Sequence, residues 1–307
     1  MPNTLAHIGL QSLASRALVR GADLKWVYLA SIVPDVPWIA RRVVERLVMP
    51  VFPALSPYDL MSYATVQSSL LLSWVLAGAL AGFSIRPRRA FAILALGALL
   101  HLLLDPLQTK WANGVLLFAP FSWELLDFGL FWPEGMPSVA LTALGLGYAL
   151  WAWRHVPAAP RGLAMPRGRV LAFGGLCAVA YLALPLALMG GPEAADNYSV
   201  RTLRQVAARP GRAVAFDRAR FEPAPGGGTL TTFAGEAVRL VGPAVPGTAG
   251  TVSIRGRFLD RRTVFVEAAH VHWPWARDLA SYLGLGLILL VWLRRPGVGA
   301  GRGEGVP

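Results

Sequence analysis

The sequence has one cysteine and few charged residues. Cys177 is the only cysteine among 307 residues, which excludes an internal disulfide and gives no indication of a redox compartment. Charged side chains make up 15% of the chain and hydrophobic ones 55%, whereas soluble domains contain roughly 25% charged residues. The segment Met1–His7 has no basic stretch followed by an apolar core, so we expect no cleaved signal peptide and insertion through internal helices.

The formal net charge of +12 has an explanation other than nucleic-acid binding. A nucleic-acid-binding domain gathers its basic residues on one soluble face, but here most of the excess lies in short loops between apolar runs. Such loops are typical of the cytoplasmic side of membrane proteins. We therefore expect membrane lipids as partners, and no nucleic acid.

Long apolar runs predict a multi-pass membrane protein, because a helix of about 20 apolar residues spans a bilayer. The runs are Leu60–Ile85, Ala90–Leu104, Val139–Trp153, Val170–Met189 and Leu279–Leu293. Basic loops at 86–89, 154–169 and 294–295 fall on one side when these helices alternate, and the positive-inside rule makes that side cytoplasmic. This predicts a bacterial-type inner (plasma) membrane protein with Asp105 and residues 190–277 on the extracytoplasmic side.

The polar, arginine-rich segment 192–277 differs from the rest of the chain. Alternation of apolar and polar residues predicts strands at Thr251–Phe258 and Thr263–Ala269. Weaker strands are predicted at Ala213–Phe216, Thr229–Phe233 and Ala237–Val241. Five short strands suit a small barrel of the OB type.

The predicted fold is a mainly α-helical integral membrane protein with an inserted small all-β, OB-like extracytoplasmic domain. Residues 1–191 form a helical membrane domain, 192–277 the β domain, 278–295 a C-terminal transmembrane helix and 296–307 a glycine-rich tail expected to be disordered.

His101 and Asp105 end the most apolar part of the chain. Residues four apart share one face of a helix, and ionisable groups within such a helix are costly unless they have a function. Thr4–Arg20, with Thr4 as its N-cap, and Leu24–Ile39 are predicted to form an antiparallel hairpin, which places His7 beside Asp35.

Two interpretations of these four residues follow. Two imidazoles and two carboxylates suit a divalent metal ion such as Zn²⁺, with room left for water. Alternatively, His101 is an interior histidine, Asp105 caps the next turn, and Asp35 belongs to a Pro-Asp turn.

Three further groups of polar residues have both a functional and a structural interpretation. Asp59 and Gln67 would add a ligand or an outer-shell contact to the metal site, or they are an interfacial aspartate and a polar residue on a helix face. The second, structural interpretation is favoured. His270 and His272 share one face of a strand, as metal-binding pairs often do, but the tryptophans that follow them, Trp273 and Trp275, favour an interfacial belt over a metal site. Arginines of the β domain are expected to form a solvated face or to contact lipid headgroups: Arg201, Arg204, Arg209, Arg212, Arg218 and Arg220.

Four ordered motifs in the first 155 residues resemble the YdjM-like (DUF457) inner-membrane metal-dependent hydrolases. The motifs are Thr4–His7 (TLAH), Ser31–Asp35 (SIVPD), His101–Thr109 (HLLLDPLQT) and Gly114–Ser122 (GVLLFAPFS). The family is thought to be distantly similar to zinc-dependent phospholipase C. The resemblance leaves the β domain unassigned.

The resemblance implies a helical metal site with His7, Asp35, His101 and Asp105 as ligands. If this site is catalytic, Asp35 and Asp105 are the candidate catalytic residues, because one of these carboxylates would double as the general base. Members often carry a His-Arg-Gly-x-Thr-His-Ser segment, whereas 62–68 has no histidine here and Gln67 stands in place of the second. A smaller ligand set implies fewer metals or a site that has lost catalysis.

The function expected from these features is hydrolysis of a phosphoester or ester of a lipid or lipid-linked substrate at the outer membrane face, with a divalent metal, Zn²⁺ by ligand type, as cofactor. The alternative is a non-catalytic membrane-anchored envelope protein whose β domain binds a partner.

Overall fold

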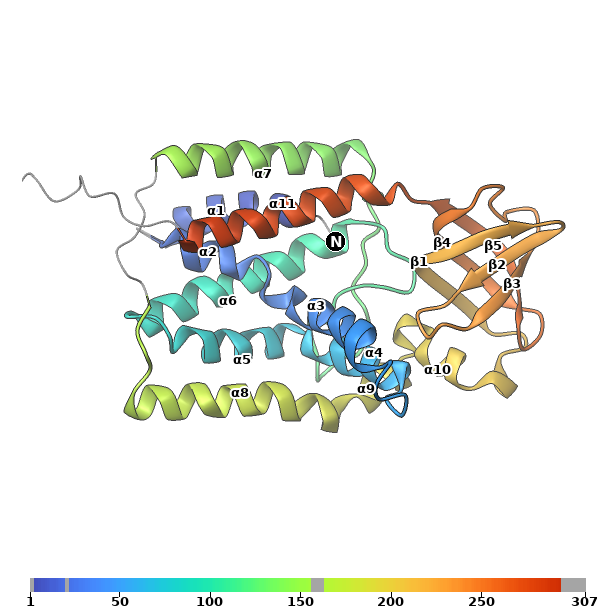
Figure 1. Ribbon diagram of the computed structural model, residues 1–307, viewed down its shortest axis with the longest axis horizontal. Helices are drawn as coiled ribbons and strands as arrows, with labels where there is room; N and C mark the ends of the chain where they lie inside the picture. The colour runs from blue at the N-terminus through green and yellow to red at the C-terminus, as the bar shows by residue number, and fades with distance from the viewer. Residues whose placement is uncertain (1–2, 20–21, 156–162, 294–307) are drawn as a thin grey trace, which may run out of the picture.

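The computed structural model describes residues 3–19, 22–155 and 163–293. A small β-barrel lies at one end of a bundle of long helices (Figure 1). The predicted tail 296–307, the basic pair at 294–295 and part of the predicted hairpin turn lie outside the described residues. A mainly helical chain with a small β domain is confirmed.

The helical part contains several long helices and a set of short ones. In chain order the helices are α1 (Thr4–Leu18), α2 (Leu24–Ala30), α3 (Val36–Val43), α4 (Pro57–Gln67), α5 (Leu70–Ala81), α6 (Pro87–Leu104), α7 (Met136–His155), α8 (Gly168–Leu188), α9 (Gly190–Ala194), α10 (Val200–Arg204) and α11 (Pro274–Leu293). α7, α8 and α11 run along the length of the bundle, and the chain enters the barrel after α8 and leaves it through α11 (Figure 1).

The first two helices differ from the prediction, α1 in its N-cap and α2 in where it ends. Asn3, not Thr4, caps α1, and its side chain accepts a hydrogen bond from the backbone N–H of Ala6 at 3.1 Å. The predicted helix Leu24–Ile39 is interrupted, because α2 ends at Ala30 and a 3₁₀ turn, Val33–Asp35, precedes α3. Proline in this turn restricts the residue before it and removes a backbone donor, which ends the helix.

The predicted span Leu60–Ile85 is not one straight helix. It consists of α4 and α5, which are bent by 73° at Ser68–Ser69. The side chain of Ser69 accepts a hydrogen bond from the N–H of Leu72 and so starts a new helix. Serine here competes with the helical hydrogen bonds, a local effect that mean hydropathy does not report.

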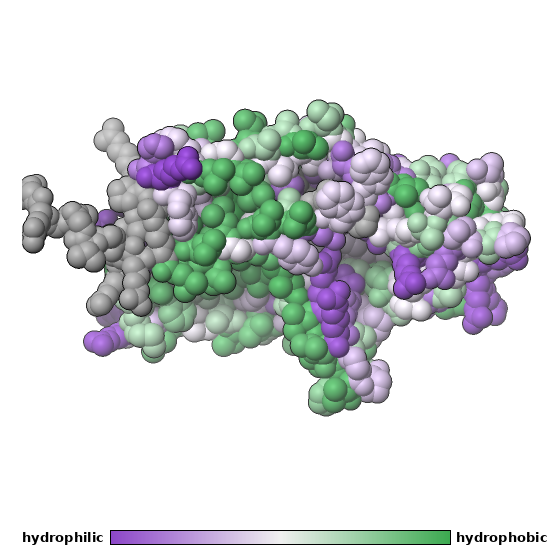
Figure 2. Space-filling view, turned by 45° about the horizontal axis from the view of Figure 1, so that its top comes forward, coloured by the Kyte–Doolittle hydropathy of each residue, from purple (hydrophilic) through white to green (hydrophobic). Residues whose placement is uncertain are grey.

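By length and composition, two helical segments of the described residues could cross a membrane. They are Pro87–Leu107 and Gly168–Ala194, and the bent α4–α5 pair would be a third. α7 and α11 occupy the other predicted spans but are not among them. Apolar side chains cover much of the helical half in Figure 2, while the barrel surface is more mixed.

α1 and α7 approach closely through two glycines. A Cβ at Gly145 would lie 2.1 Å from the carbonyl oxygen of Leu5, and one at Gly9 would lie 2.1 Å from the Cα of Gly145. Small residues permit such helix contacts within a membrane. This contact holds the α1 segment that carries His7.

Gly145→Ala is expected to destabilise the bundle, whereas Gly147→Ala is not. Overpacking costs about 1–3 kcal/mol, which exceeds the gain of up to about 1 kcal/mol when alanine replaces glycine in a helix. A Cβ at Gly147 meets nothing within 4 Å, so this change should leave stability equal or higher. Thermal unfolding in detergent, followed by far-UV circular dichroism, checks both, and equal melting temperatures for the two variants would contradict the contact.

The β domain is a closed barrel of five strands. The strands are β1 (Ala213–Ala224), β2 (Gly227–Thr231), β3 (Ala237–Val241), β4 (Gly250–Phe258) and β5 (Thr263–Val271). Their order around the barrel is β1-β2-β3-β5-β4, and only the β3–β5 pair is parallel. A bulge in β1 between Phe216 and Ala219 alters the direction of Asp217 and Arg218.

The sequence predicted that the arginines of this domain form a solvated face or contact lipid headgroups, but one of them is buried. Arg209 is fully buried, and its guanidinium donates to both carboxylate oxygens of Glu236, at 2.7 and 2.6 Å. The same guanidinium also donates to the carbonyl oxygens of Leu203 and Arg261. A buried arginine requires such partners because an unpaired charge is costly away from water.

Candidate metal centre

Three parts of the helical domain place four ionisable side chains near one another. His7 comes from α1, His101 and Asp105 from the end of α6, and Asp35 from the 3₁₀ turn after α2. His7, His101 and Asp105 are fully buried. We call His7, Asp35, His101 and Asp105 the metal centre.

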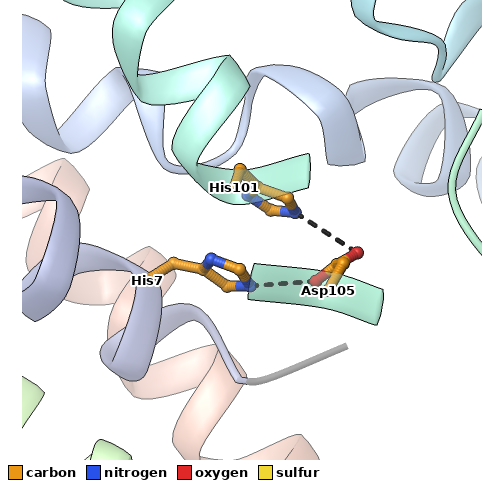
Figure 3. A group of neighbouring side chains, drawn as sticks. All are labelled: His7, His101 and Asp105. Carbon is orange, nitrogen blue, oxygen red and sulfur yellow. Dashed lines mark ion pairs between the residues drawn. The ribbon is translucent and has the colours of Figure 1, made fainter. Parts of the chain in front are cut away.

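The two imidazoles lie on top of one another and face the same carboxylate (Figure 3). Their ring centroids are 3.8 Å apart with 4° between the planes. Nε2 of His7 is 3.2 Å from Oδ1 of Asp105, and Nε2 of His101 is 3.7 Å from Oδ2. Nε2 of His101 is also 3.7 Å from Oδ1 of Asp35. These separations are close to the roughly 3.3 Å between ligand atoms in a tetrahedral site with bonds of about 2.0 Å.

The polar atoms that meet in the metal centre have no hydrogen-bond partner. They are Nε2 of His7 and of His101, both carboxylate oxygens of Asp105, and Oδ1 of Asp35. Leaving buried polar atoms unsatisfied costs about 1–3 kcal/mol each, and more for charged groups. A cation between these atoms would satisfy them together, so the donor set fits a divalent metal ion.

Contacts behind the imidazoles leave Nε2 available as a ligand. Nδ1 of His101 lies 2.8 Å from the carbonyl oxygen of Ser31, which can only accept a hydrogen bond, so Nδ1 carries the proton. Nδ1 of His7 lies 3.5 Å from Nε2 of Gln11, and if the amide were turned to present its oxygen instead, that oxygen would accept from Nδ1–H and leave Nε2 of His7 available in the same way. Metal-binding histidines ordinarily donate their second N–H in this way.

Lys110 is a member of this neighbourhood that the sequence did not reveal. Its Nζ is 3.5 Å from Oδ2 of Asp105, and its side chain is buried. In the sequence Lys110 lies five residues after Asp105, which is close to one helical turn and a residue. Pro106 ends the helix, however, so helical spacing gave no reason to place the two side chains together.

The other candidates from the α4 region lie elsewhere. Gln67 donates from Nε2 to the carbonyl oxygen of Tyr181 at 3.2 Å and so packs against α8. Asp59 pairs with Arg204 of α10. The structural interpretation of both residues, which the sequence favoured, agrees with these contacts.

A cavity of about 550 Å³ separates the barrel from the helical part next to Lys110. Three acidic residues contribute to its lining: Glu45, Asp217 and Asp278. Six cationic residues contribute as well: Arg41, Arg42, Lys110, Arg218, Arg220 and Arg277. Guanidinium groups therefore line a space that adjoins the metal centre through Lys110, and such groups are suited to bind an anion.

His270 and His272 lie next to a carboxylate. Both face Glu134, which lies in the loop before α7 and which the sequence did not single out. Burial alone would raise the pKa of Glu134, but the hydrogen bond from His272 and the neighbouring imidazole charge lower this pKa to about 2. Glu134 is therefore a carboxylate at neutral pH.

Comparisons of the chain with protein-family models, curated proteins and solved structures find no match.

Proposed function

We propose that this protein is a membrane-embedded, metal-dependent hydrolase acting on a phosphoester of a lipid or lipid-linked substrate. The observation that carries the proposal is the convergence of two fully buried imidazole nitrogens, which have no hydrogen-bond partner, on the buried carboxylate of Asp105 and the partly buried carboxylate of Asp35, beside an arginine-rich cavity. The motif resemblance to YdjM-like hydrolases supports the same reaction class.

His7, His101 and Asp105 would hold the metal, with Asp35 at the edge of the group. A divalent ion there would lower the pKa of bound water and polarise a phosphoryl oxygen. Asp35 is the most exposed of the four, with 18% of its side chain accessible, so it is placed to take a proton from an entering water molecule. Lys110 adds a positive charge that stabilises anionic oxygen at the same place.

The cavity supports a phosphate-bearing headgroup as the substrate. Four of the six lining cations pair with carboxylates: Arg41 with Glu45, Lys110 with Asp105, Arg218 with Glu134 and Arg220 with Glu222. Arg42 and Arg277 are matched in number by Asp217 and Asp278 of the lining, so a phosphate would bind by competing with carboxylates for guanidinium groups, whose forked geometry suits it. The acyl chains would stay in the bilayer beside the helices.

The arrangement of the helices supports an extracytoplasmic site in an inner membrane. The α5–α6 turn, the end of α7 and the beginning of α8 lie at the end of the bundle far from the barrel (Figure 1). These ends carry arginines at 86, 88, 89, 154, 167 and 169. By the positive-inside rule these ends would be cytoplasmic, and the metal centre and the barrel would then lie on the other side.

A hydrolysis assay on the purified full chain tests the proposal. We expect release of the phosphorylated headgroup from vesicles of phosphatidylglycerol, loss of this activity with a chelator, and recovery with Zn²⁺. His155→Ala is the matched control, since His155 is an exposed histidine at the far end of α7. If the protein binds metal but hydrolyses neither this lipid nor a soluble aryl phosphodiester, the proposal that it is a hydrolase is overturned. That result would favour the alternative, a non-catalytic membrane-anchored protein.

A further inference from the structure

A second group of ligating side chains joins the barrel to the helical part. Oε1 of Glu134 lies 2.8 Å from Nδ1 of His272, and Oε2 lies 3.3 Å from Nε2 of His270. One ligand atom from each of the three residues lies within 4.8 Å of the others. We call Glu134, His270 and His272 the junction site.

Hydrogen bonds orient His272 so that its Nδ1 faces the carboxylate of Glu134. The hydroxyl of Ser253 donates to Oδ1 of Asp217 at 3.0 Å, so its oxygen accepts from Nε2–H of His272 at 2.8 Å. The other oxygen of Asp217 accepts from Asn113. Nδ1 of His272 lies 2.8 Å from Oε1 of Glu134, and its proton makes the hydrogen bond between them. A metal ion that replaced this proton would face a lone pair of the imidazole and one of the carboxylate.

The guanidinium of Arg218 is the cation beside them, but it makes long contacts. Its Nη1 is 3.3 Å from Nδ1 of His272 and 3.5 Å from Oε1 of Glu134. Arg218 lies on the β1 bulge with φ of 53°, an unfavourable backbone conformation for a residue with a side chain. It also lines the cavity, into which its guanidinium has space to move.

We propose that the junction site binds a divalent transition-metal ion, Zn²⁺ by ligand type, and thereby fastens the barrel to the loop before α7. Two imidazoles and one carboxylate are typical Zn²⁺ ligands, with a fourth position left for water. Trp132 stacks on His270 with 3.7 Å between centroids, and Ser253 orients His272, so both rings are held in place. The inference is independent of the proposed hydrolase function.

Zinc titration of the full chain in detergent, after removal of metal with a chelator, tests the junction site. A background variant, His101→Ala with Asp105→Ala, removes two ligands of the metal centre, so we expect one remaining zinc equivalent. Glu134→Gln in this background should remove that equivalent, and His155→Ala should not. Arg218→Gln should tighten zinc binding by roughly tenfold, because it removes a neighbouring positive charge.

Two results would overturn the junction site. One is no zinc binding in the background variant, and the other is zinc that persists with both Glu134→Gln and His272→Gln. If the background variant aggregates, a fall from two equivalents to one on Glu134→Gln in the otherwise unchanged chain supports the site. Arg218→Gln offers a further check, in which hydrogen exchange of β5 measures whether the barrel loosens. If the barrel loosens while the zinc affinity is unchanged, Arg218 and the junction site form an ion-pair network instead of a metal site.

Discussion

Replacing His101 and Asp105 together by alanine is expected to lower the affinity for a divalent metal by more than about 100-fold. Loss of an outer-shell partner alone costs 10–100-fold, and this variant removes two of the residues that face one another in the metal centre. The metal content of the purified protein, with affinity measured by competition against a chromophoric chelator, checks the result. The junction site is followed separately through Glu134→Gln.

The control for this variant concerns the charge of Lys110. Removing Asp105 leaves Lys110 buried without its carboxylate, which is destabilising whether or not a metal binds. Lys110→Met added to the alanine variant restores the charge balance and separates loss of a ligand from loss of folding. If the folded triple variant keeps its full metal affinity, the metal centre is not where the ion binds.

Glu236→Ala is expected to destabilise the barrel by about 3 kcal/mol, because breaking a buried ion pair leaves an uncompensated charge. The charge left behind is the guanidinium of Arg209, which is fully buried. Since about 1.4 kcal/mol is a factor of ten, hydrogen exchange of core amides that exchange through barrel opening should accelerate roughly 100-fold. Exchange mass spectrometry on peptides from β1 and β4 of the full chain measures this.

Glu222→Ala is the matched control within the same barrel. Glu222 pairs with Arg220, but both side chains are more than half exposed, at 62% and 77%. Exposed pairs contribute about 0–1 kcal/mol, so exchange should change by less than about fivefold. Equal acceleration in the two variants would show that burial of Arg209 is not what makes its pair important.

The barrel was predictable because its strands alternate apolar and polar residues over a single core. β3 was predicted with its observed bounds, Ala237–Val241, whereas β1 is longer than Ala213–Phe216. The bulge at Asp217–Arg218 interrupts the alternation, so the pattern ended early. The bend at Ser68–Ser69 was missed for another reason, since an uncharged apolar run has the same hydropathy whether straight or bent.

The metal centre was partly predictable because its residues obey local geometry. His101 and Asp105 lie one helical turn apart, and residue counts along the first two helices placed His7 and Asp35 at one level. The junction site has no such rule, because Glu134 and His272 are distant in sequence and meet only through docking of the barrel. Tertiary contacts of this kind leave no periodicity in a single sequence.

The route of the chain through the barrel has a consequence for how firmly the barrel must bind. Entering after α8 and leaving through α11, the barrel is tethered at both ends. Its contacts with the bundle are therefore intramolecular, with an effective concentration in the millimolar range for short flexible connections. Contacts too weak to hold two separate molecules, such as the 2.8 Å hydrogen bond between Asn113 and Asp217, then suffice to keep the cavity walls together. Cutting one connection would leave the barrel tethered by the other, whereas cutting both would make its contacts intermolecular without altering any of them.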